Sequence, residues 1–240
     1  MSDRFVPTIL YEDNHLIVAY KPAGILSQSD ISGDPDMLTI LKSYLKDKYG
    51  KPGDVYLGLL HRLDRPVAGV MVFAKTSKCA ARISAQIRER RVEKDYRALV
   101  YGVPEKQTGE LRSYILKDEQ LNQVTVIHDN GSAKHGEAKE AILSYNRVAE
   151  TSMKAAEIVE AVSLLEIRLK TGRSHQIRAQ LADAGIPIVG DRKYGSSMQA
   201  YRGDICLESF RLSVFHPISG DKMIFEVPIS EKEPWRLFAR

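Results

Sequence analysis

The sequence predicts a single α+β domain with a mixed, largely antiparallel sheet and flanking helices. Strand patterns outnumber helix patterns, short turns separate them, and the two kinds of pattern do not alternate regularly along the chain. The chain has 240 residues, which is enough to bury a sizeable core. It contains no internal repeat, low-complexity segment or Gly/Ser linker. We therefore expect one compact domain over residues 1–240.

The first third of the chain reads as strand, helix, strand, strand, helix. LIVAYKPAG (16–24) predicts a strand that ends in a Pro/Gly turn, and VYLGLLHRL (55–63) and VMVFAKT (70–76) predict two strands around the turn HRLD. Ser77 is a candidate N-cap for the second helix. The apolar residues at helical spacing are Leu38, Leu41, Leu45 and Tyr49 in the first helix and Cys79, Ile83 and Ile87 in the second.

The rest of the chain is predicted to be mainly strands. KDYRALVYG (94–102) alternates as a strand does, and EIVEAVSLLEIRLKTG (157–172) is a longer strand candidate. DNGSAKHGE (129–137) has the composition of a loop or hairpin tip, and residues 205–228 read as strands with a turn at HPISGD. One helix is expected in SHQIRAQLADAGIP, with Gly185 at its C-terminus and Pro187 beyond.

Composition favours a reducing compartment. Cys79 and Cys206 lie far apart and belong to no CxxC or Cys/His cluster, so neither a disulfide framework nor a structural zinc site is expected. The N-terminus has no apolar signal core, and no stretch approaches the roughly 18 to 20 apolar residues that cross a bilayer. We expect a cytoplasmic protein without a membrane partner.

Basic residues gather in two segments although the net charge is only +4. RLKTGRSHQIR (168–178) contains four basic residues, one histidine and no acid. RERRVEKDYR (88–97) contains five basic and three acidic residues, so a solvated face explains it as well as RNA does. Both segments have the composition of phosphate-binding surfaces.

Several catalytic motifs are missing. The sequence has no GxxxxGK[ST] loop, GxGxxG fingerprint, HExxH pair or GxSxG elbow. HRLD resembles the kinase catalytic loop, but a leucine interrupts HRD, position 69 is Gly where Asn is needed, and DFG is absent. No nucleotide or metal cofactor is therefore expected.

Asp64 is the main catalytic candidate. It lies between Arg62 and Arg65 in a turn that contains Pro66 and Gly69. Nearby positive charge keeps a carboxylate ionised, and an ionised carboxylate serves as nucleophile or general base. A lone aspartate more commonly ties a turn, so the assignment depends on the wider pattern of motifs.

Five segments together resemble the RluA-type pseudouridine synthases and span almost the whole chain. They are KPAG (21–24), LLHRLDRPVAGVMVFAKT (59–76), DYRALVYG (95–102), TGRSHQIRAQLADAGIPIVGDRKYG (171–195) and LESFRLSVFHPISG (207–220). HRLDR with TGRSHQIR at this separation is the most specific pair. The resemblance implies the pseudouridine synthase fold in a catalytic domain that stands without the S4 RNA-binding domain of many relatives, since KPAG begins at position 21.

The resemblance also implies roles for four residues. Asp64 is the catalytic aspartate, Tyr96 the tyrosine that stacks on the target base, and Arg178 the basic partner of the aspartate. Arg62 enters the RNA stack when the uridine leaves it. Besides these four, we expect two further substrate-binding residues: Lys21 in KPAG, near the site as a positioning residue, and Arg173, in contact with phosphate. The sequence departs from the usual Thr-Ser-Gly after HRLD, with Val67 and Ala68 in place of the two hydroxyl residues.

These roles fit what the chemistry requires. Isomerising uridine to pseudouridine breaks the N1 glycosidic bond and rejoins the sugar to C5, without redox change or cofactor. An enzyme that acts on a base must expose it, which needs a group to fill the gap, an aromatic surface and cations for the phosphates. Asp64 would act at C1′ or C6, or as a base at C2′. We expect a monomer that binds tRNA, rRNA or both; the alternatives are a non-catalytic RNA-binding protein on the same fold and a base-releasing glycosidase.

Overall fold

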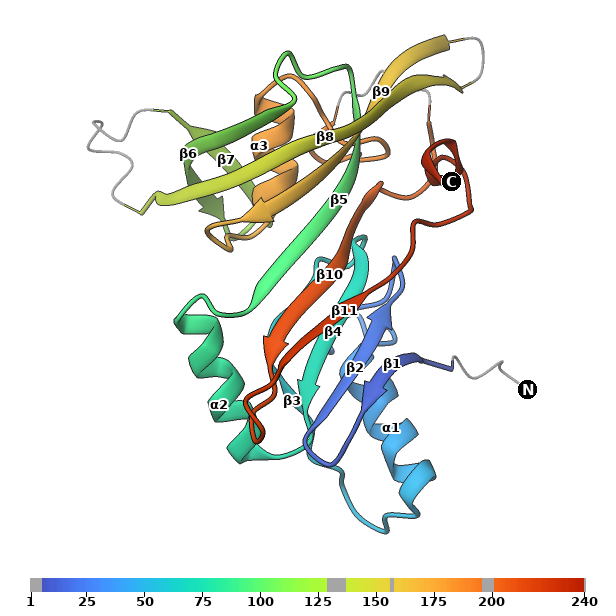
Figure 1. Cartoon of the computed structure of the whole chain (residues 1–240), viewed down its shortest axis with the longest axis vertical. Coiled ribbons are helices and arrows are strands. Elements are labelled where there is room, and N and C mark those ends of the chain that lie inside the picture. Colours follow the sequence, from blue (N-terminus) through green and yellow to red (C-terminus); the bar gives the residue numbers. More distant parts are fainter. Residues whose placement is uncertain (1–5, 129–136, 156–157, 196–200, 240) are drawn as a thin grey trace. The chain divides into compact units, whose positions relative to one another are not determined.

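Antiparallel strands dominate the computed structural model of the chain, which describes residues 6–128, 137–155, 158–195 and 201–239 (Figure 1). The chain forms two compact units. The first unit comprises Met1–Lys94 and Ser209–Pro228, and the second comprises Asp95–Glu208 and Ile229–Arg240. The division falls within two continuous strands, β5 and β10, so each unit contains part of both.

The first unit is built on β2 and β4, which pair with each other. On one side β2 pairs with β1, and on the other side β4 is a neighbour of β10. β3 pairs with β4, and β11 pairs with β10. The ladders β1–β2, β2–β4, β3–β4 and β10–β11 are antiparallel. The strands are β1 (Thr8–Glu12), β2 (Leu16–Lys21), β3 (Gly58–Leu59), β4 (Ala68–Ala74), β10 (Leu207–Phe215) and β11 (Lys222–Glu226). β2 and β4 are almost continuously apolar and buried, as expected of central strands covered on both faces.

Two helices of the first unit begin and end at residues suited to these positions. In α1 (Met37–Tyr49) the Asp36 side chain accepts a hydrogen bond from the Thr39 backbone N–H at 3.0 Å, and Gly50 closes the helix in the left-handed conformation. α2 (Ser77–Arg88) is capped by Thr76, whose hydroxyl accepts from the Cys79 N–H at 3.2 Å. The predicted cap at Ser77 is therefore wrong by one residue, because Thr76 still has extended backbone and Ser77 is already helical.

One hydrophobic cluster of the first unit joins the sheet to Ile83 of α2. It contains Leu16, Val18, Val70, Val72, Ile83, Leu212, Val214 and Phe225. Each of these side chains is at least nine-tenths buried. Burial of these apolar side chains away from water is the main source of the stability of the first unit.

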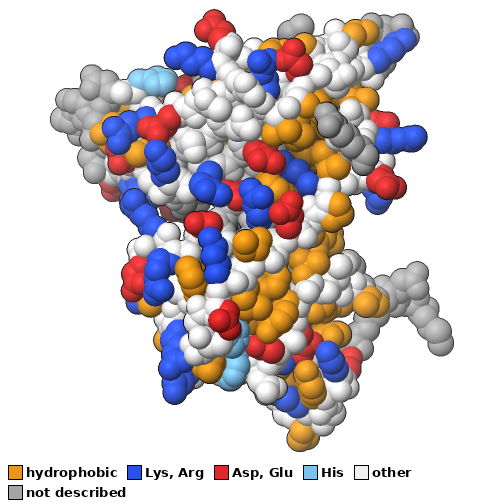
Figure 2. Space-filling model, viewed as in Figure 1, with side chains coloured by type: hydrophobic (Ala, Val, Ile, Leu, Met, Phe, Trp, Pro, Cys, Tyr) orange, Lys and Arg blue, Asp and Glu red, His pale blue; other side chains and the backbone are white. Residues whose placement is uncertain are grey.

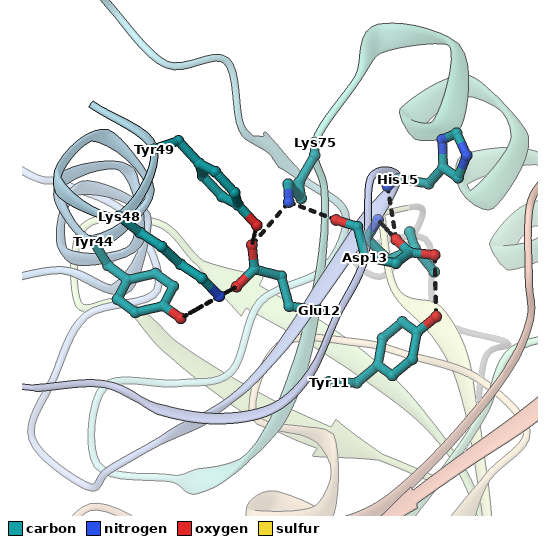
Figure 3. Close-up of polar contacts among 9 residues, drawn as sticks. Tyr11, Glu12, Asp13, His15, Tyr44, Lys48, Tyr49 and Lys75 are labelled. Atoms are coloured by element: carbon teal, nitrogen blue, oxygen red, sulfur yellow. Dashed lines mark hydrogen bonds and ion pairs between the residues drawn. The ribbon is translucent and has the colours of Figure 1, made fainter. Parts of the chain in front are cut away.

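A buried carboxylate, Glu12, ties the edge strand β1 to α1 (Figure 3). Its Oε2 accepts from Lys48 at 2.7 Å, and its Oε1 accepts from Lys75 at 2.8 Å and from the Tyr49 hydroxyl at 2.7 Å. Burial raises the pKa of the Glu12 carboxyl, but these hydrogen bonds outweigh burial and lower the pKa to about 2. Glu12 therefore stays ionised at neutral pH and fixes the edge of the sheet.

The second unit is a set of long antiparallel strands with one α-helix among its described residues. β9 pairs with β5 and β8, and β6 pairs with β8 and β7, in each case antiparallel. The elements are β5 (Glu93–Tyr101), β6 (Thr108–Asp118), β7 (Gln123–Ile127), β8 (Lys139–Ala155), β9 (Ile158–Leu169), α3 (Gln176–Asp183) and a 3-10 turn, η2 (Trp235–Phe238). A small core cluster joins Ile115, Val124, Ala141 and Ala179.

The structure confirms the α+β class with a largely antiparallel sheet. The predicted strands at 16–24, 70–76, 94–102 and 157–172 are present, with ends shifted by a few residues. The predicted loop at 129–137 lies almost wholly outside the described residues. Among the described residues no helix is long and apolar enough to cross a membrane.

One predicted strand, 55–63, is mostly wrong. Only Gly58–Leu59 pair as β3. Leu57 and Leu63 are buried, which explains the apolar pattern. The backbone around Leu63 bonds to a neighbouring loop instead of to a strand, and this loop builds the candidate site.

Candidate active site

Asp64 begins a tight turn directly before β4. Its backbone carbonyl accepts a hydrogen bond from the Val67 N–H at 3.0 Å, and the Asp64 side chain is partly buried. The preceding residue, Leu63, is held by the Ser27 hydroxyl, which accepts from the Leu63 N–H at 3.0 Å and donates to the Leu63 carbonyl at 2.7 Å. The backbone on both sides of Asp64 is thus fixed by specific hydrogen bonds.

The KPAG loop is bonded to the residue that follows Asp64. The Gly24 N–H donates to the Arg65 carbonyl at 2.9 Å, and the Arg65 Nε donates back to the Gly24 carbonyl at 3.1 Å. Arg65 also forms an exposed ion pair of 2.8 Å with Asp34. These contacts give Arg65 a structural acid as its partner.

Lys21 is the buried centre of this loop pair. Its side chain is fully buried, and its amine donates to three backbone carbonyls, those of Ile25 at 2.7 Å, Pro22 at 3.0 Å and Arg65 at 3.0 Å. Burial lowers the pKa of the Lys21 amine to about 7, although the nearby charge of Asp64 raises it. Lys21 therefore bonds to the backbone of the KPAG loop and to the backbone of the Asp64 turn, and this arrangement positions the turn.

The two residues before Leu63 have opposite environments. Arg62 is exposed, as a residue that reaches into RNA needs to be. His61 is buried, and its Nε2 accepts from the Val72 N–H at 3.1 Å. Burial, with a smaller effect from the charge of Lys94, holds the His61 pKa well below its usual value, so the ring is neutral and structural.

Val67, Ala68 and Gly69 join the turn to β4. Val67 is buried, so an apolar residue fits where the family pattern has a hydroxyl. Gly69 has φ +143°, and a Cβ placed on it would lie 2.5 Å from the Ser209 carbonyl oxygen and 2.6 Å from the Ser209 nitrogen. Only glycine allows β4 and β10 to approach this closely.

Tyr96 lies on β5 opposite Ile167 of β9 and is 6% exposed. The residues on either side of it are charged but also buried. Asp95 accepts from Arg168 at 2.6 and 2.9 Å, and Arg97 forms an ion pair with Glu208. These two ion pairs join β5 to Arg168 of β9 and to Glu208 of β10 on either side of Tyr96.

Arg178 is held on α3 by a partner that the sequence did not indicate. Its Nε and Nη2 each donate to one oxygen of the Asp191 carboxylate at 2.8 Å, and both side chains are almost fully buried. Burial raises the Asp191 pKa, but the hydrogen bonds and charge of Arg178 outweigh this and lower it. The centre of the Tyr194 ring lies 5.1 Å from the guanidinium carbon of Arg178.

The loop before α3 is closed by Gln176. Its Oε1 accepts from the Thr171 hydroxyl at 2.9 Å and from the Arg173 N–H at 3.1 Å. The Arg173 side chain is exposed, with its Nε donating to the Glu140 carbonyl at 2.9 Å. His175 bonds through Nδ1 to the Tyr194 hydroxyl at 2.7 Å, so this histidine belongs to the network that supports Arg178.

The candidate residues therefore form two sets. Lys21, Arg62 and Asp64 lie in the first unit, and Tyr96, Arg173 and Arg178 lie in the second. Within each set the structure shows how the side chains are held. The pairing of Asp64 with Arg178 stays a prediction.

Asp191 and Tyr194 are supporting residues that sequence reasoning missed, although both lie in GDRKYG. A buried arginine needs a counter-ion, and Asp191 is an acid 13 residues after Arg178. This requirement was the available signal. In the described parts of the chain no cluster of three or more His, Cys, Asp or Glu residues has the arrangement of a metal site.

Comparison with known proteins shows one consistent family. A family model described as RNA pseudouridylate synthase matches residues 15–183. Among the similar proteins, tRNA pseudouridine synthase C of Vibrio parahaemolyticus is 30% identical over 97% of this chain and 94% of its own length. The dual-specificity RNA pseudouridine synthase RluA of Haemophilus influenzae is 31% identical over 90% of each chain.

Solved structures show the same fold. Human RNA Pseudouridylate Synthase Domain Containing 1 is similar with a TM-score of 0.73, at 21% identity, over 94% of this chain and 85% of that chain. The corresponding values for Human RNA Pseudouridylate Synthase Domain Containing 4 are 0.72, 22%, 92% and 87%. At these identities the likeness concerns the fold alone.

Proposed function

The chain belongs to the RNA pseudouridylate synthase family, and we propose that it isomerises specific uridines in RNA to pseudouridine, with Asp64 as the catalytic residue. The observation that carries the proposal is the construction of the Asp64 turn. Its backbone is held by Ser27, Gly24 and the buried amine of Lys21, and its carboxylate lies close enough to Lys21 to affect the pKa of that amine. A rigid loop that presents one carboxylate beside a buried cation fits a preorganised catalytic group.

The reaction needs few parts. The N1–C1′ bond breaks, a C5–C1′ bond forms, the proton on C5 is lost and N1 gains a proton, so substrate and product have the same composition. Asp64 acts at C1′ or C6 of the nucleotide, or as a base at C2′. No electron donor, acceptor or phosphate donor enters this balance.

The remaining roles extend the same proposal. Tyr96 stacks on the flipped base, Arg62 fills the gap that the uridine leaves in the RNA, and Arg173 contacts a phosphate. The exposure of Arg62 and Arg173 supports these two contacts. We propose that Arg178 pairs with Asp64 through the edge of its guanidinium that Asp191 does not occupy.

The role of Lys21 is sharper in the light of the structure. Because the amine is buried and donates to three backbone carbonyls, we assign it to positioning the Asp64 turn and not to contact with RNA. The absence of hydroxyls at Val67 and Ala68 leaves this arrangement intact, since the turn is held by backbone bonds.

The substrate is proposed to be tRNA, rRNA or both. The similar proteins include one named for tRNA, one named ribosomal large subunit pseudouridine synthase D from Zymomonas mobilis, and one named for dual specificity. Action in the cytoplasm as a monomer is part of the same proposal. Mapping pseudouridines in tRNA and rRNA from cells with and without the gene identifies the modified positions.

The test of the catalytic assignment is Asp64→Asn, which keeps the side-chain shape and removes the charge. We expect pseudouridine formation to be abolished while the RNA dissociation constant stays within a few fold, because phosphate contacts dominate binding. Turnover by this variant at a substantial rate would remove Asp64 from the mechanism.

Analysis of the products also separates the alternative functions. A pseudouridine synthase yields pseudouridine, a non-catalytic RNA-binding protein leaves the RNA unchanged, and a glycosidase yields an abasic site and free uracil. Wild-type protein that yields either of the last two results contradicts the proposed function.

A further inference from the structure

α2 presents a basic face that the proposed active site does not use. Residues 77–91 contain five basic residues and one acidic residue, a net charge of +4, which equals the net charge of the entire chain. Cys79, Ile83 and Gln86 are the buried residues of the helix. The acid, Glu89, is already engaged by Arg91 at 2.7 Å. The segment is therefore an uncompensated concentration of positive charge.

The outward residues of α2 share one side of the helix. They are Lys78, Ala81, Arg82, Ala85 and Arg88, which at 3.6 residues per turn lie within about 120° around the helix axis. We call them the α2 basic face. Lys78, Arg82 and Arg88 are exposed, and ten residues of helix place the first and last of them about 15 Å apart along the axis. The two alanines between them leave room for another backbone to approach.

Folding of the helix does not explain these charges. Lys78 lies in the first turn, where the helix dipole disfavours a cation, and the first turn contains no acid. Throughout the described residues, no ion pair joins Lys78, Arg82 or Arg88 to a carboxylate. Arg82 is held in place by a hydrogen bond of 2.6 Å from its Nη1 to the Pro217 carbonyl, which directs it without neutralising it. Figure 2 shows basic side chains gathered over the position that α2 has in Figure 1.

We propose that the α2 basic face binds the phosphate backbone of the substrate RNA outside the segment that enters the active site. The inference rests on the proposed function and adds to it a second contact surface. RNA suits this face because it offers a row of phosphates to a row of cations. The outward side lacks the Trp, Phe or Leu that an interfacial membrane helix needs.

The chain path places the start of α2 well away from Asp64. The chain leaves the Asp64 turn, crosses the sheet as β4 (Ala68–Ala74) and enters α2 at its far end. Seven residues of strand cover about 20 Å. An RNA that reaches Lys78 must therefore extend well beyond its target nucleotide, so RNA length becomes a variable of the test.

The experiment compares two triple variants with equal charge change. One is Lys78→Gln, Arg82→Gln, Arg88→Gln on the α2 basic face. The other is Lys42→Gln, Lys46→Gln, Lys51→Gln, whose three lysines are exposed on α1 and just after it. The probes are a full-length unmodified tRNA transcript and one isolated stem-loop from it, and the dissociation constant is measured over a range of salt concentrations.

For the full-length transcript we expect the α2 variant to raise the dissociation constant at least tenfold. The slope of log affinity against log salt should become shallower by about two to three, one phosphate for each cation removed. The α1 variant, and the isolated stem-loop with either variant, should stay within threefold of wild type. The single-turnover rate at saturating RNA should not change, because none of these residues belongs to the catalytic set.

Equal weakening by the two triple variants would overturn the inference, since net charge alone would then explain the effect. An unchanged dissociation constant for the α2 variant would also overturn it and would favour an acidic protein as the partner of this face. Should loss of the Arg82 bond to Pro217 unfold the helix, the double variant Lys78→Gln, Arg88→Gln decides the question with that bond intact. If wild-type protein binds RNA through this face but forms no pseudouridine, the proposed function is refuted and the inference about the α2 basic face still holds.

Discussion

The Asp64 turn and the Arg178 helix are held by different kinds of interaction. Around Asp64 the supporting contacts go to the backbone, through Ser27, Gly24 and the three carbonyls that surround the Lys21 amine. Around Arg178 they are made by side chains, through the Asp191 carboxylate and the Tyr194 ring. The Asp64 turn depends on backbone conformation, and the Arg178 helix depends on paired charges. Substitutions that alter the backbone should therefore destabilise the first region, and substitutions that remove a charge should destabilise the second.

The two regions also differ in how they treat a buried cation. The charge of Arg178 is neutralised by Asp191 through two parallel hydrogen bonds, and bidentate pairs of this kind are among the strongest charged hydrogen bonds. Lys21 is surrounded by carbonyl dipoles, and burial lowers its pKa to about 7. A change of pH near neutrality should therefore act on the first region and leave the second unaffected.

The largest effect is expected from Gly69→Ala, which tests the dependence of the first region on backbone shape. The added Cβ meets the Ser209 backbone at 2.5 and 2.6 Å, and φ of +143° is strained for any L side chain. Strain and overpacking together should lower the free energy of unfolding by about 4 kcal/mol or more. Urea denaturation measures this.

The matched control for Gly69→Ala is Gly24→Ala. Gly24 also has a positive φ, +86°, but an added Cβ would meet nothing within 4 Å. Its substitution should cost about 1 kcal/mol, from strain alone. If the two variants lose the same stability, close approach of β4 and β10 is not what requires glycine at position 69.

Asp191→Ala should have the next largest effect, because it leaves the buried guanidinium of Arg178 without its counter-ion. Breaking a buried ion pair in this way costs about 3 kcal/mol or more. Asp34→Ala removes the acid of an exposed pair, that of Arg65, and should cost less than about 1 kcal/mol. A small loss for Asp191→Ala in thermal or urea unfolding would show that side-chain charge does not hold the second region.

A smaller, pH-dependent effect is expected from Lys21. Since the folded pKa of about 7 lies below the value of 10.5 for an exposed lysine, the unfolded chain binds more protons between these two pH values. Stability therefore rises with pH across this window, by roughly 2 kcal/mol between pH 7 and 9 for this one group. The quantity to measure is the difference in unfolding free energy between wild type and Lys21→Met as a function of pH. A difference that is flat, or that falls with pH, would mean that the amine keeps an ordinary pKa.

The elements that sequence patterns predicted correctly are those with regular periodicity. α3 is an example: of Ile177, Leu181 and Ala184, which have helical spacing, the first two are buried and Ala184 is exposed at the end of the helix. Gly185 at φ +77° ends the helix, with the Ile186 N–H bonded to the Leu181 carbonyl. Leucine or isoleucine at helical spacing followed by glycine is enough to specify such a helix.

The elements that were missed break the periodicity on which prediction depends. β8 contains a register shift between Arg147 and Ala149, so its alternation changes phase in the middle. β6 alternates in burial, but its inward positions include Gly109 and Ser113, so its sequence lacks a clear apolar alternation. β7 has five residues, too few for a clear pattern. Burial of apolar side chains misled the prediction in the other direction at 55–63, where the buried Leu57 and Leu63 imitate the pattern of a strand.

The sequence motifs of the candidate site could be recognised, but the residues and backbone groups that hold the site residues in place could not. HRLDR and HQIR point to Asp64 and Arg178 through the resemblance of the five segments to the RluA-type synthases, and the roles of both residues stay predictions. The three-carbonyl environment of Lys21 is invisible in the sequence, since the acceptors are backbone groups that every residue carries. Asp191 was missed for a different reason: the need for a counter-ion follows from the burial of Arg178, which is evident only once the fold is known.

The smallest effect expected, in free energy, separates the two arginines that compete as partner of Asp64. Arg65 is adjacent in sequence, yet its guanidinium is used by the Gly24 carbonyl and by Asp34 on an exposed surface. Arg178 has one edge fixed by Asp191, which orients the other edge. Lysine at position 178 keeps the charge but loses the planar fork, so Asp64 should be misaligned in Arg178→Lys. We expect its single-turnover rate to fall at least about tenfold, or roughly 1.4 kcal/mol of barrier, with a much smaller change in RNA affinity.

Arg65→Lys should stay within about threefold of wild type in rate, since exposed pairs contribute little. If Arg65→Lys is the slow variant and Arg178→Lys turns over normally, the aspartate is oriented by its neighbour in sequence, and the charge-held region has no part in its chemistry.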